Sequence, residues 1–172
     1  MQKIKDLLGL PVLETESGTQ IGEVKEVIID LDQAAVRGII VANANWFTCE
    51  QGIEFNDLSS IGRDAVMVRS EAVVQAAAVF AETADNQVYR LDELADKPIY
   101  TESGLQLGML VDLGFEPVTG EIKAYHVSDG VITDLIYGRM SLPLPQAQVV
   151  GQDKVIVPEA MAKLLHTETE LS

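Results

Sequence analysis

The sequence is poor in cysteine, aromatic residues and basic residues. Its 172 residues include one cysteine, 5% aromatics, and 12 Lys and Arg against 27 Asp and Glu. A single cysteine excludes an internal disulfide, which suits a reducing compartment. Because aromatics are scarce, the core must be built mainly from Val, Ile, Leu and Ala. Hydrophobic residues still make up 47% of the chain, which indicates a folded protein.

Long apolar runs are also missing. The longest nearly apolar stretch, residues 73–81, contains Gln75 and is far shorter than the roughly 20 residues of a membrane-spanning helix. The opening MQKIKDLLGLPVLE has no apolar segment ahead of a cleavage site, so we expect no signal peptide. These two absences predict a cytoplasmic protein without a transmembrane segment.

The formal net charge of −15 is spread over the whole chain. Residues 1–86 hold fourteen acidic and six basic residues, and residues 87–172 hold thirteen and six. A nucleic-acid-binding surface needs Lys and Arg to replace the counterions of the phosphates, so we expect no direct contact with nucleic acid. An acidic field keeps soluble molecules apart, and it steers encounter with a protein partner that has a basic surface.

The tetrapeptide TESG occurs at residues 15–18 and again at 101–104, an offset of 86. The same offset aligns VRGIIV from Val36 with IKAYHV from Ile122. After a three-residue insertion, an offset of 89 aligns residues 53–68 with 142–157, including a Gly-x-Asp turn in each. Apolar positions and glycines agree over some 60 positions, so the chain contains two copies of one domain.

Each copy has the pattern of a small β-barrel followed by a short α-helix. Short segments rich in β-branched residues alternate with turn residues, which is typical of closely spaced strands. The helices are expected over 70–82, with Ser70 as N-cap, and over 158–166, with Pro158 in the first turn. The glycines expected to shape turns, bulges and barrel corners are Gly18, Gly22, Gly62, Gly104, Gly108 and Gly151.

The expected organisation is therefore mainly β. A first barrel with its closing helix spans 1–82, a polar linker 83–88, a second barrel with its helix 89–166, and a frayed tail 167–172.

The first copy resembles the start of a PRC-barrel domain. The residues that carry the resemblance are Leu8, Gly9, Val12, Glu16, Gly18, Ile21, Gly22, Val24 and Asp30. The second copy keeps Gly104, Leu107, Gly108 and Glu116, but it lacks the Leu-Gly lead-in and has Ala124 where the first copy has Gly38. As two modules the chain is similar to the tandem PRC-barrel proteins of Gram-positive bacteria.

The resemblance implies docking rather than catalysis. Members of the family include the cytoplasmic domain of the photosynthetic reaction-centre H subunit and the C-terminal domain of the ribosome maturation factor RimM, which binds a ribosomal protein. We therefore expect a non-enzymatic adaptor that docks on a protein partner. Two alternatives stay open: a ribosome-associated or RNA-processing accessory factor similar to RimM, and a barrel that binds a small ligand. The sequence also leaves a homo-oligomer open.

Two apolar loops are the candidate interaction sites. The first contains Asn45, Trp46 and Phe47, and its counterpart in the second copy contains Ile136, Tyr137 and Met140. Exposed aromatic residues beside amides would make a contact patch. The alternative is that Trp46 and Phe47 complete the barrel core at a strand end.

No residue pattern indicates catalysis, a metal or a cofactor. Cys49 is followed by Glu50, which disfavours a thiolate, and we expect an idle thiol. His126 falls in a strand pattern and His166 near a helix end, and both are expected to be structural. The carboxylate pairs Asp30/Asp32 and Glu14/Glu16 lack the further ligands of a calcium site. Phosphate-binding loops, dinucleotide fingerprints and nucleophile elbows are absent.

Overall fold

The computed structural model describes residues 1–45, 49–80, 88–128, 140–144 and 148–164. Over these residues the chain is mainly β, as the sequence predicts. It divides into two compact units: the first holds Met1–Glu93 and Phe115–Ile122, and the second holds Leu94–Gly114 and Lys123–Ser172. In the described residues no helix is long and apolar enough to cross a membrane.

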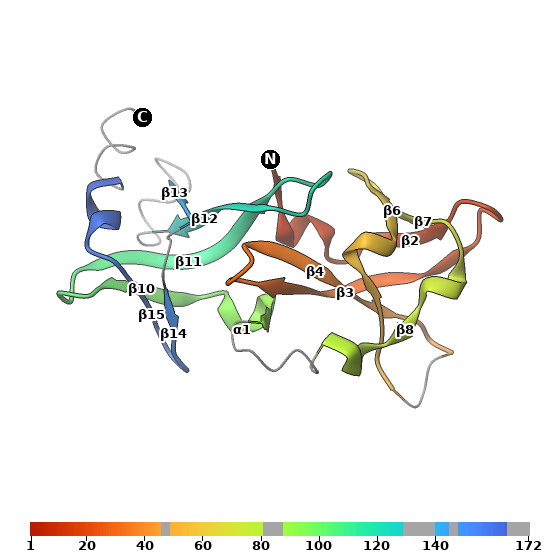
Figure 1. Cartoon of the computed structure of the whole chain (residues 1–172), viewed down its shortest axis with the longest axis horizontal. Helices are drawn as coiled ribbons and strands as arrows, with labels where there is room; N and C mark the ends of the chain where they lie inside the picture. Colours follow the sequence, from red (N-terminus) through yellow and green to blue (C-terminus); the bar gives the residue numbers. More distant parts are fainter. Residues whose placement is uncertain (46–48, 81–87, 129–139, 145–147, 165–172) are drawn as a thin grey trace. The chain divides into compact units, whose positions relative to one another are not determined.

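The first unit is built on a sheet with the strand order β6-β7-β2-β3-β4-β5-β8. The long strand β3 lies between β2 and β4, and these strands run along the first unit in Figure 1. β2 pairs antiparallel with β3 and parallel with β7. The bounds are β2 (Pro11–Glu14), β3 (Gln20–Asp30), β4 (Ala35–Ala42), β5 (Gln51–Glu54), β6 (Leu58–Ile61), β7 (Val66–Val68) and β8 (Gln75–Ala76); β1 (Gln2–Lys3) and the 3-10 helix η1 (Ile4–Leu7) precede them, and η2 (Phe55–Asp57) joins β5 to β6.

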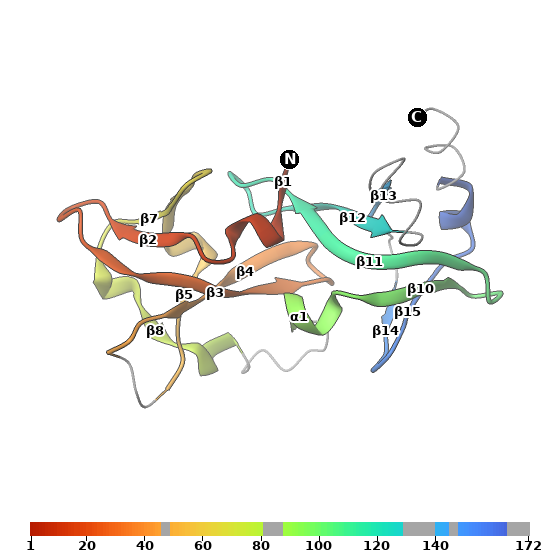
Figure 2. The same cartoon turned by 180° about the vertical axis from the view of Figure 1, so that it is seen from behind.

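The sheet of the second unit repeats this order as β14-β15-β10-β11-β12-β13. Figure 2 shows the long hairpin of β10 and β11 with β15 beside it. β10 pairs antiparallel with the long strand β11 and parallel with β15, as β2 does with β3 and β7 in the first unit. The bounds are β10 (Lys97–Thr101), β11 (Gln106–Phe115), β12 (Ile122–Ser128), β13 (Met140–Pro143), β14 (Val149–Val150) and β15 (Val155–Val157).

Both sheets carry the same bulge at the start of the long strand. The pairing of β2 with β3 slips between Val12↔Gly22 and Leu13↔Gln20, and that of β10 with β11 slips between Ile99↔Gly108 and Tyr100↔Gln106. At both bulges the next strand comes too close for a side chain. A Cβ on Gly22 would lie 2.7 Å from Val41 Cγ1, and one on Gly108 would lie 2.6 Å from Ser128 O. Gly108 also has a φ of +142°, which other residues rarely adopt.

The backbone hydrogen bond that closes the second TESG turn begins one residue later than in the first turn. Different carboxylates fix the two turns. Glu14 N donates to Thr19 O at 2.9 Å, whereas Thr101 N donates to Leu105 O at 2.8 Å, so Thr101 stands in the place of Glu14. In the first turn the Glu14 carboxylate accepts from Ser17 Oγ at 2.6 Å and from Glu71 N at 2.5 Å. In the second turn the carboxylate comes from the other side, because Glu159 accepts from Ser103 N. The first turn is thereby tied to the segment after β7, and the second to the segment after β15.

Residues 115–122, the tip of the hairpin between β11 and β12, belong to the first unit. Val36 N donates to Gly120 O, and Ile122 N donates to Ala34 O, both at 2.8 Å. The first unit consequently holds eighteen acidic and seven basic residues, a formal charge of −11, and the second unit holds nine and five, a charge of −4. The acidity that looked evenly spread along the sequence is concentrated in one unit.

Aliphatic side chains fill the interior of each unit, as the composition predicts. In the first unit, fully buried residues come from η1 and from β2, β3, β4, β5 and β7. In the second they come from β10, β11, β12, β13 and β15, with Tyr125 as the large aromatic. Side chains with no exposed surface include Ile4, Leu7, Val12, Val27, Ile29, Ile39, Ile53, Val66 and Val68 in the first unit and Ile99, Leu113, Val127, Leu142 and Val155 in the second.

The predicted helix over 70–82 is wrong for its described part. Ser70 does act as a cap, because its Oγ accepts from Ala72 N at 3.2 Å. However, the segment forms two 3-10 turns, η3 (Glu71–Val73) and η4 (Ala77–Phe80), separated by β8. β8 pairs with β5, so backbone groups that a helix would use internally are satisfied by the sheet. Tertiary pairing thus overrides the helix propensity of the alanine-rich run.

Phe80 holds this segment against the sheet. Its side chain is 6% exposed and packs with Ile28 and Ile40. A Cβ on Gly38 would lie 2.6 Å from the ring, and so would one on Gly52, so two glycines provide the flat seat of the ring. Ala124 replaces Gly38 in the second copy, and that seat is therefore particular to the first unit.

Two elements follow the expected linker. β9 (Val88–Arg90) pairs antiparallel with the end of β3, and the single turn α1 (Leu91–Leu94) comes directly after it. Val88, expected in the linker, is therefore part of a strand of the first unit, and residues 83–87 lie outside the described residues. A helix is present at 160–164 after Pro158, and His166 and the tail 167–172 lie outside the described residues.

We expect Gly22→Ala to destabilise the protein by about 1–3 kcal/mol, because the new Cβ forces β3 away from β4. The matched control is Gly62→Ala, whose Cβ would meet its nearest atom, Ala65 O, at 3.2 Å. Urea unfolding midpoints of both variants measure the difference. Equal losses in the two variants would contradict the close approach at Gly22.

Candidate functional site

The structure describes only part of the candidate interaction loops. Asn45 is exposed in the turn that follows β4. Met140 begins β13 opposite Val127, and its side chain is not described. Trp46, Phe47, Ile136 and Tyr137 lie outside the described residues, so the hypothesis of an aromatic contact patch stays a prediction.

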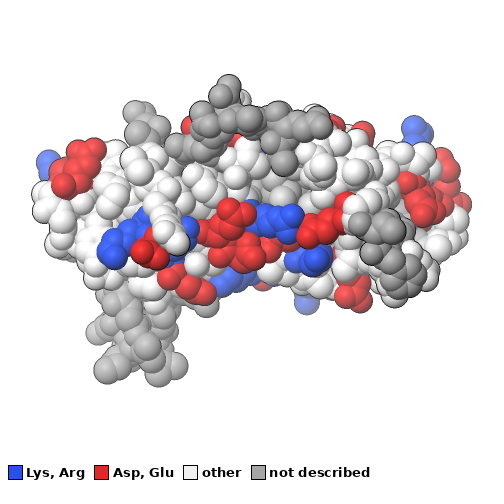
Figure 3. Space-filling model, turned by 90° about the horizontal axis from the view of Figure 1, so that it is seen from below, with Lys and Arg blue, Asp and Glu red and all other residues white. Residues whose placement is uncertain are grey.

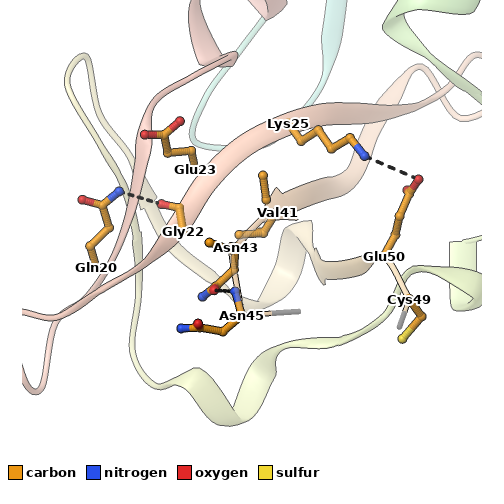
Figure 4. Close-up of a pocket in the computed structure, with 11 residues that line it drawn as sticks. Gln20, Gly22, Glu23, Lys25, Val41, Asn43, Asn45, Cys49 and Glu50 are labelled. Atoms are coloured by element: carbon orange, nitrogen blue, oxygen red, sulfur yellow. Dashed lines mark hydrogen bonds and ion pairs between the residues drawn. The ribbon is translucent and has the colours of Figure 1, made fainter. Parts of the chain in front are cut away.

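Asn45 lines an open pocket of about 870 Å³ in the first unit. Its walls come from the start of β3, the end of β4 with the following turn, and the residues ahead of β5 (Figure 4). Apolar lining comes from Val41 and Ala42. The polar and charged residues around it include Gln20, Lys25, Asn43, Asn45, Cys49 and Glu50. Of this set, the sequence analysis proposed Asn45 as a contact residue and expected Cys49 to be an idle thiol.

Two amide side chains of the pocket are used to fix the backbone around it. Asn43 Nδ2 donates to Ile21 O, and Asn43 Oδ1 accepts from Asn45 N at 2.8 Å. Gln20 Nε2 donates to Gly22 O at 3.2 Å, beside the bulge. The turn after β4 is thus anchored to β3, and it presents the exposed Asn45 side chain at the pocket rim. Asn45 is the residue of this group best placed to contact another molecule.

A charged triad borders the pocket. Glu50 accepts from Arg90 Nη2 at 2.8 Å and lies 3.7 Å from Lys25 Nζ. The Arg90 hydrogen bond lowers the pKa of Glu50, and Glu50 in turn raises the pKa of Arg90. The three side chains are 38–53% exposed, so the triad positions these charges and adds little stability. Sequence reasoning missed it because Arg90 lies 40 residues from Glu50.

Glu26 is a buried carboxylate beside this triad. It is 9% exposed, and its Oε1 accepts from Val27 N at 3.1 Å and from Leu91 N, the first residue of α1, at 3.2 Å. Burial raises the pKa of Glu26; the charge of Asp92 also raises it, while the two backbone hydrogen bonds and Arg90 act in the opposite sense. The carboxylate therefore connects β3 to α1 at a cost in desolvation.

The remaining candidates have structural surroundings. Cys49 is exposed and its Sγ accepts from Gln51 Nε2 at 3.0 Å, an amide that cannot act as a base. Asp30 is 6% exposed, accepts from Gln33 N at 2.9 Å and pairs with Arg37 at 3.3 Å, so it closes the turn after β3. His126 lies in β12 opposite Ser141. No group of three or more His, Cys, Asp and Glu gathers as metal ligands within the described residues.

Charges of both signs are interspersed on the face shown in Figure 3. Some of the Asp and Glu side chains lie beside Lys or Arg there, and others form small groups of their own.

We expect Glu26→Gln to stabilise the protein at neutral pH. Because the folded state raises the pKa of Glu26, the native protein holds that proton more tightly than the unfolded chain, so stability falls as pH rises from about 4.5 through the raised value. The substituted amide carries no charge to desolvate and keeps an acceptor for Val27 N and Leu91 N. The melting temperature of the variant should exceed that of the parent at pH 7, and the gain should vanish below pH 4.5. Glu23→Gln, on an exposed position of β3, is the control and should show no such pH-dependent gain.

Comparison with known proteins gives one family. Residues 1–75 match the model of the PRC-barrel domain. No curated protein matches the chain. The matched range takes in the sheet of the first unit through the first residue of β8, including the bulge at Gly22 and the turn with Asn45. Residues 1–75 of this chain are thus a PRC-barrel domain.

Proposed function

We propose that the chain is a non-enzymatic adaptor that docks on a protein partner with a basic surface. The arrangement of the pocket beside Asn45 carries this proposal. Asn43 and Gln20 hold the backbone, and Lys25, Glu50 and Arg90 are engaged with one another. What the pocket offers to another molecule is an open surface with an exposed amide, which suits recognition more than a reaction.

The charge of the first unit supports the basic partner. A formal charge of −11 on about a hundred residues attracts a cationic surface and speeds encounter, an effect that salt weakens. The same charge disfavours the RNA-binding alternative, since phosphates would be repelled.

We further propose that the second unit is a second PRC-type barrel of a tandem protein. Three observations support this: the strand order is the same, the bulge recurs at Gly108, and the pairing of β10 with β15 repeats that of β2 with β7.

We also propose a cytoplasmic location. The exposed thiol of Cys49 fits it, because such thiols stay reduced there.

Affinity capture from lysate of the source cells tests the adaptor proposal. We expect the tagged full chain to retain a partner protein at about 50 mM salt and to release most of it at about 500 mM, as screened charges would do. Asn45→Arg, which adds bulk and the unfavourable charge to the rim, should reduce the retained partner at least fivefold.

The matched control is Gln152→Arg, which makes the same change on an exposed amide of the second unit. It should retain the partner as the parent does. Absence of a partner at both salt concentrations would overturn the adaptor proposal. Equal losses in the two variants would remove the pocket beside Asn45 from it.

A further inference from the structure

The strand β6 is the terminal strand of the first sheet. In the described part of the chain it pairs with β7 alone, so one row of its backbone N–H and C=O groups faces away from the sheet. Such an edge is a template for strand addition. The other terminal strand of that sheet, β8, and the equivalent strand of the second sheet, β14, have only two residues each. The remaining terminal strand, β13, also has four residues, but it ends at Pro143, which has no backbone N–H to donate.

Two pockets flank β6. The smaller, of about 160 Å³, is lined by Phe55, by all four residues of β6, and by Pro117 and Val118. The larger, of about 520 Å³, is lined by Met1, Gln2, Asp6, Gly62 and Arg63, and Ile61 lines both pockets. All of these residues belong to the first unit. The smaller pocket is below the roughly 300 Å³ of a typical small-molecule site, so it suits a single side chain of a peptide.

Val118 gives the edge an apolar rim. Its side chain is 84% exposed, the largest value among the exposed large hydrophobic residues of the described chain. A single exposed valine needs no explanation. Here, however, Val118 lines a pocket together with Phe55, Leu58 and Ile61, all partly buried, so apolar surface continues from the hairpin tip to the edge strand.

β6 is built to accept a short segment only. It has four residues, and its pairing with β7 slips between Leu58 and Ser60, which leaves a bulge. Short, bulged edges resist open-ended association. At about 3.3 Å per residue, β6 can pair with roughly four residues of another chain. This length favours a peptide segment over the edge of a whole sheet.

We propose that β6 is a docking edge that takes an extended peptide segment of a protein partner, in which aliphatic residues alternate with Lys or Arg. The backbone of the segment pairs with β6, and one aliphatic side chain enters the pocket between Leu58 and Val118. The −11 charge of the first unit selects the basic residues. This inference rests on the proposed function only in that the partner is a protein. The site is separate from the pocket beside Asn45, since the two pockets share no residue.

Synthetic peptides and the purified full chain test the docking edge. The probe is a fluorescein-labelled pool of eight-residue peptides in which Lys or Arg alternates with Val, Ile or Leu, and the control pool has Glu in place of Lys and Arg. We expect fluorescence anisotropy to show binding of the basic pool alone. Hydrogen–deuterium exchange should show slower exchange of the backbone amides of residues 58–61 in its presence.

Val118→Lys should weaken binding of the basic pool at least fivefold, because it removes the apolar rim and adds a like charge. The matched control, Val149→Lys, changes an exposed valine of β14 in the same way and should bind within twofold of the parent. Melting temperatures check that both variants fold.

Four results would overturn the docking edge: no binding of the basic pool, equal binding of the acidic pool, equal affinity of the two variants, or protection away from residues 58–61. A chain that sediments as a dimer, and as a monomer after Val118→Lys, would show that a second copy occupies the edge instead. None of these results changes the outcome of the lysate capture with Asn45→Arg. Failure of the edge is therefore distinct from failure of the adaptor proposal.

Discussion

Each sheet depends on a glycine where the long strand passes close to its neighbour. At Gly22 the backbone of β3 lies so near the end of β4 that no side chain fits between them, and Gly108 repeats this between β11 and β12. Both glycines lie next to a slip in the pairing with the preceding strand. A bulge increases local twist and bends the strand. The same bend therefore begins both long strands, and it lets one strand pair with two neighbours along different parts of its length.

Around this common frame the two units have diverged. In the first, Gly38 and Gly52 seat the ring of Phe80, so the segment after β7 is held on the sheet. In the second, Ala124 occupies the position of Gly38, and the corresponding segment begins a helix at 160–164 that reaches back to the turn through Glu159. The first turn uses Glu14 for the equivalent connection. In the first unit the carboxylate belongs to the strand before the turn, and in the second unit it belongs to the segment after β15.

The sequence was sufficient to predict what depends on local pattern. Alternating β-branched residues, the position of Gly22 and Gly108, and the internal repeat led to the strands and to two similar sheets. The alanine-rich run before Phe80 was misassigned, because its structure is decided by pairing with β5 and by two distant glycines. Likewise, contact of Arg90 with Glu50 has no local signal. Of the candidate site, Asn45 followed from the sequence, whereas Lys25, Glu50 and the edge strand β6 needed the fold.

The tip of the hairpin between β11 and β12 makes the first unit discontinuous, since Ala34 and Val36 bond to Gly120 and Ile122 across more than eighty residues. A ribosome synthesising this chain completes the residues of the family match long before it reaches that tip. The strand end at Val36 must wait for its partner until translation has passed Ile122. These two hydrogen bonds can therefore form only during synthesis of the second half, and a gene fragment that stops at residue 75 omits part of the first unit.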